Sequence, residues 1–210
     1  MAKPKFYVVW KGRTPGVYES WEVCEAQIKG FAGAEFKAFK TRALAEEAFH
    51  GNSNEFIGQE VFETTLTPDQ LALIGKPNLE SISVDAAWNT QTGDVEYQGV
   101  ETRTRKQLFH QGPFPDGTIN IAEFLAIVHA LAHCQRERLT CPIYSDSRNA
   151  IGWVKDKEVR TNHPRREANK KLFELVDRAL AWLKTHENTN ELLQWETRAW
   201  GENPADFGRK

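Results

Sequence analysis

Apolar residues recur with two different periods in the second half of the chain, and each period indicates its own kind of element. Alternating segments rich in β-branched residues predict strands, whereas apolar positions three and four apart predict helices. The strand-like segments are 81–89, 94–103, 107–113, 142–145 and 191–195. The helix-like segments run from Ile121 to about Arg136, from Ser147 to Lys157 and from Arg165 to Thr185. Three consecutive strands followed by alternating helices and strands predict an α/β domain with a mixed five-stranded sheet flanked by helices.

The first fifty residues carry a separate and shorter pattern, in the order strand, strand, helix, strand, helix. Pro15-Gly16 suits a tight turn between the first two strands. Ser20 and Thr41 suit the N-caps of the two helices. Aromatic residues are frequent throughout, and the simplest interpretation for most of them is a small core. We therefore expect a three-stranded α/β domain at residues 1–50.

Residues 51–79 lack a strong period and are acidic. Residues 51–80 contain one lysine and five acidic residues, whereas residues 1–50 contain eight basic and six acidic ones. Thr67-Pro68-Asp69 could start one short helix. We predict that 51–79 is a flexible connector to a second domain at 80–210.

Composition narrows the class of protein. The 210 residues are 40% hydrophobic and 27% charged, with a net charge of -2, which is typical of a soluble globular protein. No apolar run approaches the roughly 18 residues of a membrane span, and no signal-type apolar stretch follows the basic N-terminus. The scattered Cys24, Cys134 and Cys141 argue against a disulfide framework or a zinc site. We expect a monomer in the cytoplasm, without membrane contact.

Four carboxylates lie where α/β proteins usually build their sites. Asp85 lies inside a predicted strand, where an unpaired buried charge is costly. Asp146 ends a short apolar strand, Glu123 starts a helix, and Asp206 lies in the tail. Strand ends and helix starts gather at one edge of such a sheet. Oxygen ligands select Mg²⁺ or Mn²⁺, and two such ions can activate water against a phosphodiester. The acids therefore predict metal-dependent phosphodiester chemistry.

Some of these residues also have an ordinary interpretation. Glu123 or Asp206 alone could be a helix cap or a surface acid, whereas Asp85 within its strand is harder to explain in that way. Trp21 and Phe36 lie near lysines, an arrangement that can stack on sugars or bases while the cation meets phosphate.

The first module resembles the hybrid-binding domain of type 1 ribonucleases H. The resemblance rests on Phe6 to Arg13, Gly16-Val17-Tyr18, Trp21, Cys24 to Gln27 and Phe36 to Phe39. It implies that Trp21 and Phe36 grip the DNA strand of an RNA/DNA hybrid, with Tyr7 and Lys37 assisting. Family members often carry a second lysine where this chain has Ala38.

The second half resembles the ribonuclease H domain, and the chain as a whole resembles the bacterial two-domain enzymes. The motifs are Ser83-Val84-Asp85, Asn120 to Ala126, Tyr144 to Ser147 and Trp200 to Phe207. The resemblance implies a ribonuclease H-like fold. It also implies hydrolysis of the RNA strand of RNA/DNA hybrids, leaving 5′-phosphate and 3′-hydroxyl ends.

The resemblance assigns two Mg²⁺ ions, with Mn²⁺ as a substitute, to Asp85, Glu123, Asp146 and Asp206. One branch of the family has a mobile histidine before the last aspartate, and this chain has none there. Glu202 resembles the substitute of another branch, and it could approach the metals if the tail turns helically.

The remaining expectations concern substrate grip. Thr118, Asn120, Thr161 and Asn162 fall where relatives bind a DNA-strand phosphate, although Thr118 and Asn120 could simply cap a helix. Trp88 occupies a region that is glycine-rich in relatives and that reads RNA 2′-hydroxyls. A basic patch could touch nucleic acid or be a solvated helix face; it comprises Arg160, Arg165, Arg166, Lys170 and Lys171.

Two other functions compete with the hybrid-specific endonuclease. A non-catalytic hybrid-binding protein is disfavoured because all metal-ligand positions are filled. A DNA nuclease of the same fold is disfavoured by the hybrid-binding module. No P-loop, nucleophile elbow or dinucleotide fingerprint is present.

Overall fold

A computed structural model describes residues 5–57, 64–187 and 189–208. The chain divides into two compact units, Met1–Thr65 and Leu66–Lys210. Each unit has its own sheet and its own apolar core. None of the helices in the described segments combines the length and the apolar character needed to cross a lipid bilayer.

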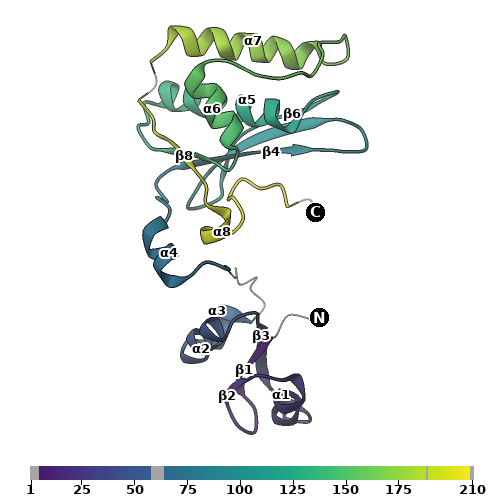
Figure 1. The fold of residues 1–210 in the computed structure, drawn as a ribbon, viewed down its shortest axis with the longest axis vertical. Coiled ribbons are helices and arrows are strands. Elements are labelled where there is room, and N and C mark those ends of the chain that lie inside the picture. The colour runs from purple at the N-terminus through teal and green to yellow at the C-terminus, as the bar shows by residue number, and fades with distance from the viewer. Residues whose placement is uncertain (1–4, 58–63, 188, 209–210) are drawn as a thin grey trace. The chain divides into compact units, whose positions relative to one another are not determined.

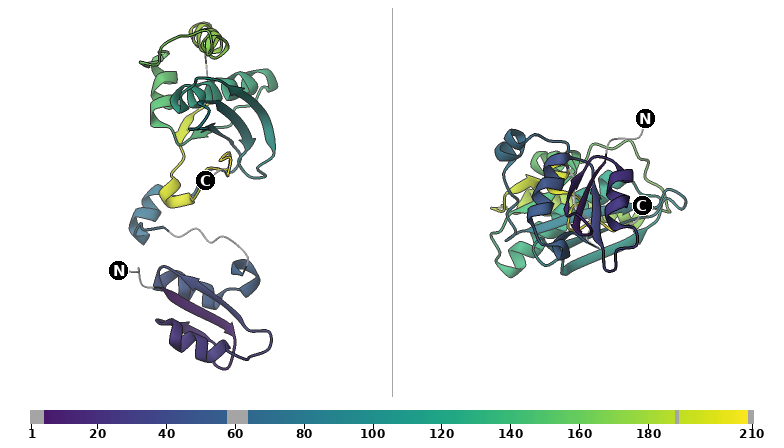
Figure 2. Two further views of the ribbon diagram at one scale, coloured as in Figure 1. Left: turned by 90° about the vertical axis from the view of Figure 1, so that its right-hand side faces the viewer. Right: turned by 90° about the horizontal axis from the view of Figure 1, so that it is seen from below.

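The smaller unit is an antiparallel sheet with strand order β2–β1–β3. Its strands are β1 (Phe6–Lys11), β2 (Gly16–Tyr18) and β3 (Glu35–Phe39). The helices α1 (Trp21–Ile28) and α2 (Arg42–His50) cover its opposite faces (Figure 2). Because side chains alternate along a strand, Val8 joins the core under α2 while its neighbour Val9 is buried on the α1 side. The predicted caps are confirmed, since the Ser20 and Thr41 side chains accept backbone N–H groups of α1 and α2.

The larger unit contains the five-stranded sheet, in the order β6–β5–β4–β7–β8. Its strands are β4 (Ile82–Trp88), β5 (Val95–Glu101), β6 (Gln107–Phe114), β7 (Ile143–Ser145) and β8 (Leu192–Gln194). The pairs β4–β5 and β5–β6 are antiparallel, whereas β4–β7 and β7–β8 are parallel. The predicted mixed sheet flanked by helices is therefore confirmed.

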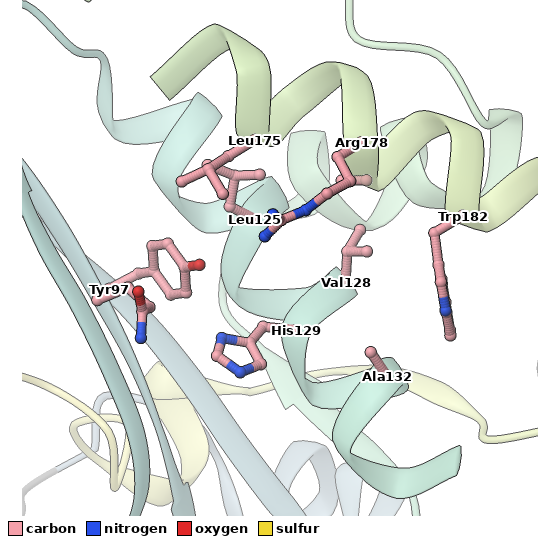
Figure 3. A pocket seen from close by; sticks show the side chains of 10 residues that line it. Tyr97, Leu125, Val128, His129, Ala132, Leu175, Arg178 and Trp182 are labelled. Atoms are coloured by element: carbon pink, nitrogen blue, oxygen red, sulfur yellow. The ribbon is translucent and has the colours of Figure 1, made fainter. Parts of the chain in front are cut away.

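Three helices lie in layers on one face of this sheet. They are α5 (Ile119–Glu137), α6 (Arg148–Asp156) and α7 (Lys170–Thr185). α5 packs directly on β4 and β5 and contributes more buried core residues than any other element described, and α7 lies beyond it (Figure 1). Between α7, α5 and the strands β5 and β6 remains a cavity of about 360 Å³ (Figure 3).

The tail of the chain lies on the other face of the sheet (Figure 1). It begins with the short helix α8 (Thr197–Trp200), which the apolar pattern did not predict. Trp200 and Trp195 meet edge-on, with ring centroids 5.1 Å apart, and both contact Tyr144 of β7. This aromatic cluster holds the start of the tail against the central strands.

The first residues of the predicted connector pack on the smaller unit, and its last residues contact the larger unit. In the short helix α3 (Ser53–Phe56), Phe56 stacks on Trp10 of the smaller unit at 5.8 Å. The expected helix near Thr67 is present as α4 (Pro68–Ile74). Just after it, the Gly75 carbonyl accepts a hydrogen bond from Trp200 Nε1 at 2.8 Å. Residues 58–63 of the predicted connector lie outside the described residues, and its bounds of 51–79 stay a prediction.

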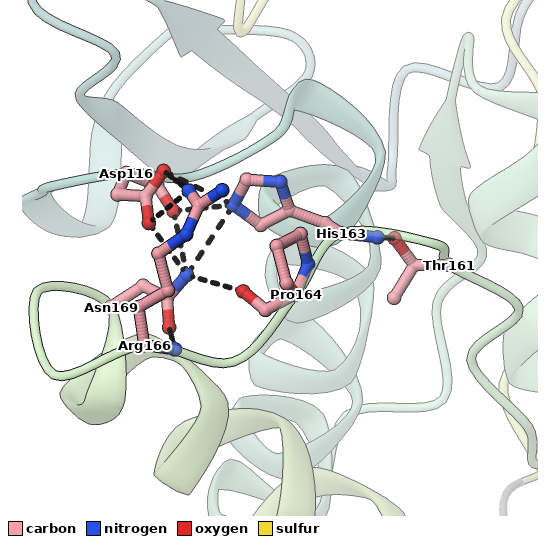
Figure 4. A network of polar contacts seen from close by, with 6 residues as sticks. All are labelled: Asp116, Thr161, His163, Pro164, Arg166 and Asn169. Atoms are coloured by element: carbon pink, nitrogen blue, oxygen red, sulfur yellow. Dashed lines mark hydrogen bonds and ion pairs between the residues drawn. The ribbon is translucent and has the colours of Figure 1, made fainter.

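Helix α7 begins five residues later than the predicted Arg165, because a polar network holds the preceding turn (Figure 4). The fully buried Asn169 is its centre. Asn169 Nδ2 donates to the Asp116 carboxylate at 2.9 Å and to the Pro164 carbonyl at 3.0 Å, and Asn169 Oδ1 accepts the Arg166 N–H at 2.8 Å. Arg166 Nη1 also pairs with Asp116 at 3.0 Å. The network ties the turn before α7 to the turn before α5.

We expect Asn169→Ala to lower the free energy of unfolding by about 2–4 kcal/mol, because it leaves buried partners without hydrogen bonds. Urea denaturation measures the change. The control is Asn162→Ala, which removes an exposed amide from the same loop and should stay within about 0.5 kcal/mol of wild type. A loss for Asn169→Ala as small as that of the control would contradict a structural role for the network.

Candidate metal centre

Asp85 and Asp146 lie at the same level of the sheet on neighbouring strands. β4 and β7 run parallel, with Ser83 opposite Tyr144. Asp85 lies two residues beyond Ser83, and Asp146 lies two residues beyond Tyr144, directly after β7. Since every second residue of a strand points to the same face, this register brings the two carboxylates to one side of the sheet edge.

Glu123 reaches the same place from α5. Its side chain is 5% exposed. Glu123 Oε1 accepts the Ala86 N–H at 3.2 Å, and Oε2 accepts the Ser145 hydroxyl at 3.5 Å. Glu123 is therefore held between the ends of β4 and β7.

The three acids Asp85, Glu123 and Asp146 each offer an oxygen within 4.8 Å of the others. The structure thus brings together three of the four predicted ligands in an all-oxygen cluster. Hard divalent cations such as Mg²⁺ and Mn²⁺ prefer such a donor set.

The pKa values of all three acids in the cluster are raised. Burial raises the pKa of Asp85 to about 7, and the nearby Asp146 and Asp206 carboxylates add to the rise. Burial, followed by the repulsion of Asp85 and Asp146, raises the pKa of Glu123 well above its usual value. Burial also raises the pKa of Asp146. A cation would relieve both the burial cost and the repulsion, so the donor set fits a divalent metal.

Asp206 approaches this cluster from the tail, which hydrogen bonds fasten to the sheet. Asn203 Nδ2 donates to the Val84 carbonyl at 2.9 Å, and Gln98 Nε2 donates to the Ala205 carbonyl at 2.7 Å. Asp206 then lines the same pocket as Asp85. Asn203 is 4% exposed, and its contact with β4 positions the last predicted ligand.

Glu202 lies close enough for its charge to raise the pKa of Asp146. The expected route was wrong, however, because residues 201–208 contain turns and irregular backbone and no helix. The exposed Glu202 thus lies near Asp146 on an irregular segment of the tail.

Asn203 and Gln98 are positioning residues that the sequence analysis did not single out. Asn203 lies within the quoted tail motif, and an asparagine directly before Pro204 indicates a turn. Nothing in the sequence around Gln98 indicates its contact with the tail, because the two residues of that contact are 107 positions apart.

The predicted phosphate-binding residues lie on two adjacent segments. Thr118 stands at the N-cap of α5 without a side-chain cap bond, so plain capping does not account for its hydroxyl. Asn120 follows in the first turn of α5, and Thr161 and Asn162 lie in the loop after α6. His163 Nε2 lies 2.8 Å from the Asp116 carbonyl, which brings that loop beside the start of α5. Their phosphate role stays a prediction.

An open pocket of about 530 Å³ runs beside the acids. Asp85 and Asp206 line it together with the segment 86–91 and Phe207. Trp88 is 49% exposed on this rim. The side chain that departs from the glycine-rich pattern therefore borders the candidate metal centre.

The basic patch is largely paired within the unit. Arg160 pairs with Asp156 at 2.6 Å, Arg165 with Asp177 at 2.6 Å, and Lys170 with Glu167 at 4.0 Å. Together with the Arg166 pair described above, these contacts favour a solvated surface over a free cationic face.

In the smaller unit, three predicted hybrid-binding residues form one aromatic cluster. Tyr7 and Trp21 have ring centroids 5.5 Å apart, and Trp21 and Phe36 are 6.0 Å apart. Trp21 and Phe36 are each 40% exposed, a large accessible area for aromatic side chains.

Lys37 does not join this cluster. It pairs with Val8 across the sheet, whereas Phe36 pairs with Val9, so the two side chains point to opposite faces. Lys37 Nζ donates to the Phe56 carbonyl at 2.7 Å. Lys37 therefore lies on the opposite face from the aromatic pair and contacts α3, and its expected part in hybrid binding stays a prediction.

Two family models match the chain. The model described as the Ribonuclease H1 N-terminal domain matches residues 5–49, and the RNase H model matches residues 79–196, more than half of the chain. The chain belongs to the RNase H family. The range matched by the RNase H model contains Asp85, Glu123 and Asp146 and stops before Glu202 and Asp206.

Two named relatives match short stretches of the chain. A Ribonuclease H from Crithidia fasciculata is 54% identical over 43 residues, which is 20% of this chain and 9% of that protein. A Ribonuclease H from Saccharomyces cerevisiae is 41% identical over 49 residues, 23% of this chain and 14% of that protein. The chain thus spans a small part of the length of these two relatives. The resemblance to bacterial enzymes stays a prediction.

Solved RNase H structures are also similar to part of the chain. The N-terminal RNase H domain of a Mycobacterium tuberculosis protein, solved as a fusion with maltose-binding protein, is 18% identical with a TM-score of 0.36. The match covers 57% of this chain and 88% of that one.

We expect Asp85→Asn to raise the free energy of unfolding of the metal-free larger unit at pH 8 by roughly 2–4 kcal/mol. The pKa of Asp85 is higher in the folded than in the unfolded chain. Between about pH 4 and 7 the folded state therefore keeps a proton that the unfolded state releases, and wild-type stability falls as the pH rises through this window. Asp85→Asn has no carboxyl group at this position to titrate, so it should not lose this stability as the pH rises.

Urea denaturation in EDTA at a series of pH values measures this difference, which should shrink toward pH 4. Asp156→Asn removes an exposed acid of α6 and should show no such pH dependence. Equal stability of Asp85→Asn and wild type at pH 8 would contradict the strained carboxylate cluster.

Proposed function

We propose that this chain is an endonuclease that hydrolyses the RNA strand of RNA/DNA hybrids with two divalent metal ions. The observation that carries the proposal is the set of three carboxylates within 4.8 Å in a domain of the RNase H family. A non-catalytic binding protein would have no need for the buried acids Asp85 and Glu123, whose pKa values are raised by burial and by neighbouring carboxylates.

Asp85, Glu123, Asp146 and Asp206 would hold the metals, with Mg²⁺ as the expected ion and Mn²⁺ as its substitute. When bound, such ions activate a water and stabilise the leaving oxygen of the phosphodiester. Cleavage at the 3′ oxygen leaves 5′-phosphate and 3′-hydroxyl ends, as the family resemblance implies.

The groups around these acids, the Ala86 backbone N–H among them, have positioning and charge roles. Ala86 and Ser145 orient the Glu123 carboxylate through its two oxygens. Asn203 and Gln98 keep the tail on β4 and β5, so that Asp206 stays beside Asp85. Glu202 adds negative charge near Asp146, and we propose that it assists at the metals in place of a loop histidine.

The smaller unit would supply affinity for the hybrid. The match to the Ribonuclease H1 N-terminal domain and the exposed cluster of Tyr7, Trp21 and Phe36 support this role. Aromatic rings stack on sugars and bases without regard to sequence, which suits an enzyme that acts on many hybrids. Thr118, Asn120, Thr161 and Asn162 would bind a phosphate of the DNA strand.

We further propose that the enzyme acts as a monomer in the cytoplasm. The three cysteines are all free, which agrees with a reducing compartment.

Asp146→Asn tests the nuclease activity, because it keeps the size of the side chain and removes one metal-binding charge. We expect cleavage of end-labelled RNA in a hybrid to fall by roughly 10²-fold or more, since metal stabilisation is worth several kcal/mol. Asp156→Asn, an exposed acid on the helix that follows Asp146, should cleave like wild type. Mg²⁺ should support cutting and EDTA should abolish it.

Duplex RNA, single-stranded RNA and duplex DNA accompany the hybrid as substrates. Cutting of the hybrid alone supports the proposed specificity, and cutting of DNA would instead identify a DNA nuclease of this fold. Tight hybrid binding without cutting in Mg²⁺ or Mn²⁺ would leave a binding protein.

Trp21→Ala tests the separate role of the smaller unit. Loss of one stacking ring should weaken hybrid binding about tenfold or more, while turnover of a saturating short hybrid stays within about twofold of wild type. Binding is measured by fluorescence anisotropy with Asp146→Asn as the background, and turnover is measured with Asp146 intact.

The matched control is Phe31→Ala, which removes another partly exposed ring of the same unit. Equal losses in the two variants would contradict a specific aromatic grip. Complete loss of turnover in Trp21→Ala would contradict the modular division of labour.

A further inference from the structure

The cavity between α5 and α7 is separate from the candidate metal centre. It contains none of the carboxylates assigned to the metals. Its volume of about 360 Å³ lies in the range of small-molecule sites. The strands β5 and β6 close one side, and the two helices form the others (Figure 3).

Most of the cavity wall is apolar, and the apolar side chains extend to one end of it. Those side chains are Leu125, Val128, Ala132, Leu175, Ala179 and Trp182. Trp182 stands at the end far from Tyr97 (Figure 3). This half of the cavity suits a ring system or a short alkyl chain.

Polar groups gather at the opposite end, and two of them lack partners. Tyr97 is 4% exposed and points its hydroxyl into the cavity (Figure 3). Within the described segments, neither the Tyr97 hydroxyl nor the Arg178 guanidinium makes a hydrogen bond or an ion pair with another residue. Buried hydroxyls are nearly always hydrogen-bonded, so the Tyr97 hydroxyl is arranged to meet an acceptor, and the exposed Arg178 lies beside it in the cavity wall.

Arg178 extends from α7 into the cavity between Tyr97 and Val128 (Figure 3). Its charge acts on both Tyr97 and His129. Gln111 pairs with Tyr97 across β5 and β6, so its amide lies on the same side of the sheet. A guanidinium, a phenol and an amide thus converge on one end of the cavity, a donor set that suits a carboxylate.

His129 limits the charge at this end to a single cation. Its ring stacks on Phe109 with centroids 3.9 Å apart. Burial, together with the charges of His133, Arg136 and Arg178, lowers the pKa of His129 to about 4. The imidazole is therefore neutral near pH 7, and one guanidinium balances a monoanion rather than a dianion.

We propose that this cavity is a binding site for a small amphiphilic carboxylate. Its head accepts hydrogen bonds from Arg178 and the Tyr97 hydroxyl, and its apolar body runs between α5 and α7 toward Trp182. The site is independent of the nuclease proposal, because it shares no residue with the metal centre or with the aromatic cluster of the smaller unit.

Isothermal titration calorimetry on the full chain tests the site with 1-naphthylacetate as the ring-bearing probe and octanoate as the alkyl probe. The uncharged 1-naphthylacetamide has the same body without the anion. We expect the two carboxylates to bind with one site per chain and the amide to bind at least about tenfold more weakly, because it loses the charge-assisted hydrogen bonds. The probe that binds more tightly identifies a ring or an alkyl chain as the preferred body.

Variants locate the binding. Tyr97→Phe keeps the ring and removes the hydroxyl, and Arg178→Met removes the cation while keeping much of the apolar stem. Each should weaken 1-naphthylacetate about tenfold or more. Ala132→Leu should fill the apolar end of the cavity and block binding, although the Tyr97 hydroxyl and the Arg178 guanidinium are both retained. Lys184→Met removes a charge from the last turn of α7 outside the cavity and should change nothing.

Asp146→Asn should bind the probes like wild type, which keeps this test separate from the nuclease. Circular dichroism and melting curves confirm that each variant is folded. Equal affinity of the wild type for 1-naphthylacetate and 1-naphthylacetamide would overturn the proposal in favour of a non-specific apolar crevice. Unchanged affinity for 1-naphthylacetate in both Tyr97→Phe and Arg178→Met would do the same. Absence of binding by both carboxylates at millimolar concentration would overturn it outright.

Discussion

Repulsion among three carboxylates, two of them buried, is the constraint on which the larger unit depends. Asp85, Glu123 and Asp146 approach within 4.8 Å of one another, and burial raises the pKa of each. Such a cluster is unfavourable unless a cation or a proton neutralises it. Favourable packing elsewhere must therefore offset the unfavourable free energy of the cluster. The buried helix α5 and the central strands packed against it provide that packing.

The same elements that stabilise the unit also aim the acids. α5 fills the core with apolar side chains along most of its length, yet it turns Glu123 toward the sheet edge, where Ala86 and Ser145 hold it. Parallel pairing of β4 and β7 sets Asp85 and Asp146 at one level. A change in that register would separate the acids and disrupt the core together, because side chains alternate along each strand. Stability and geometry are thus specified by the same contacts.

The alternation of side chains along a strand also decides which residues meet in the smaller unit. Phe36 and Lys37 are neighbours in sequence, yet one joins the exposed aromatic cluster and the other contacts α3 on the opposite face. In the larger unit, α7 lies over α5 as an outer layer and leaves a cavity lined by the exposed Arg178 and the buried Tyr97. Both surfaces arise from which face a residue occupies, and composition alone does not reveal them.

The sequence by itself determined the mixed five-stranded sheet, the three-stranded smaller unit and the candidate acids, because these depend on local periods and on charges in apolar settings. Only the tertiary structure decided how Asn203 and Gln98 fasten the tail, why α7 begins at Lys170, and where Lys37 points. These outcomes depend on contacts between residues far apart in the chain, such as Gln98 with Ala205 and Asn169 with Asp116. No local period records such contacts, since they form only when packing brings the segments together.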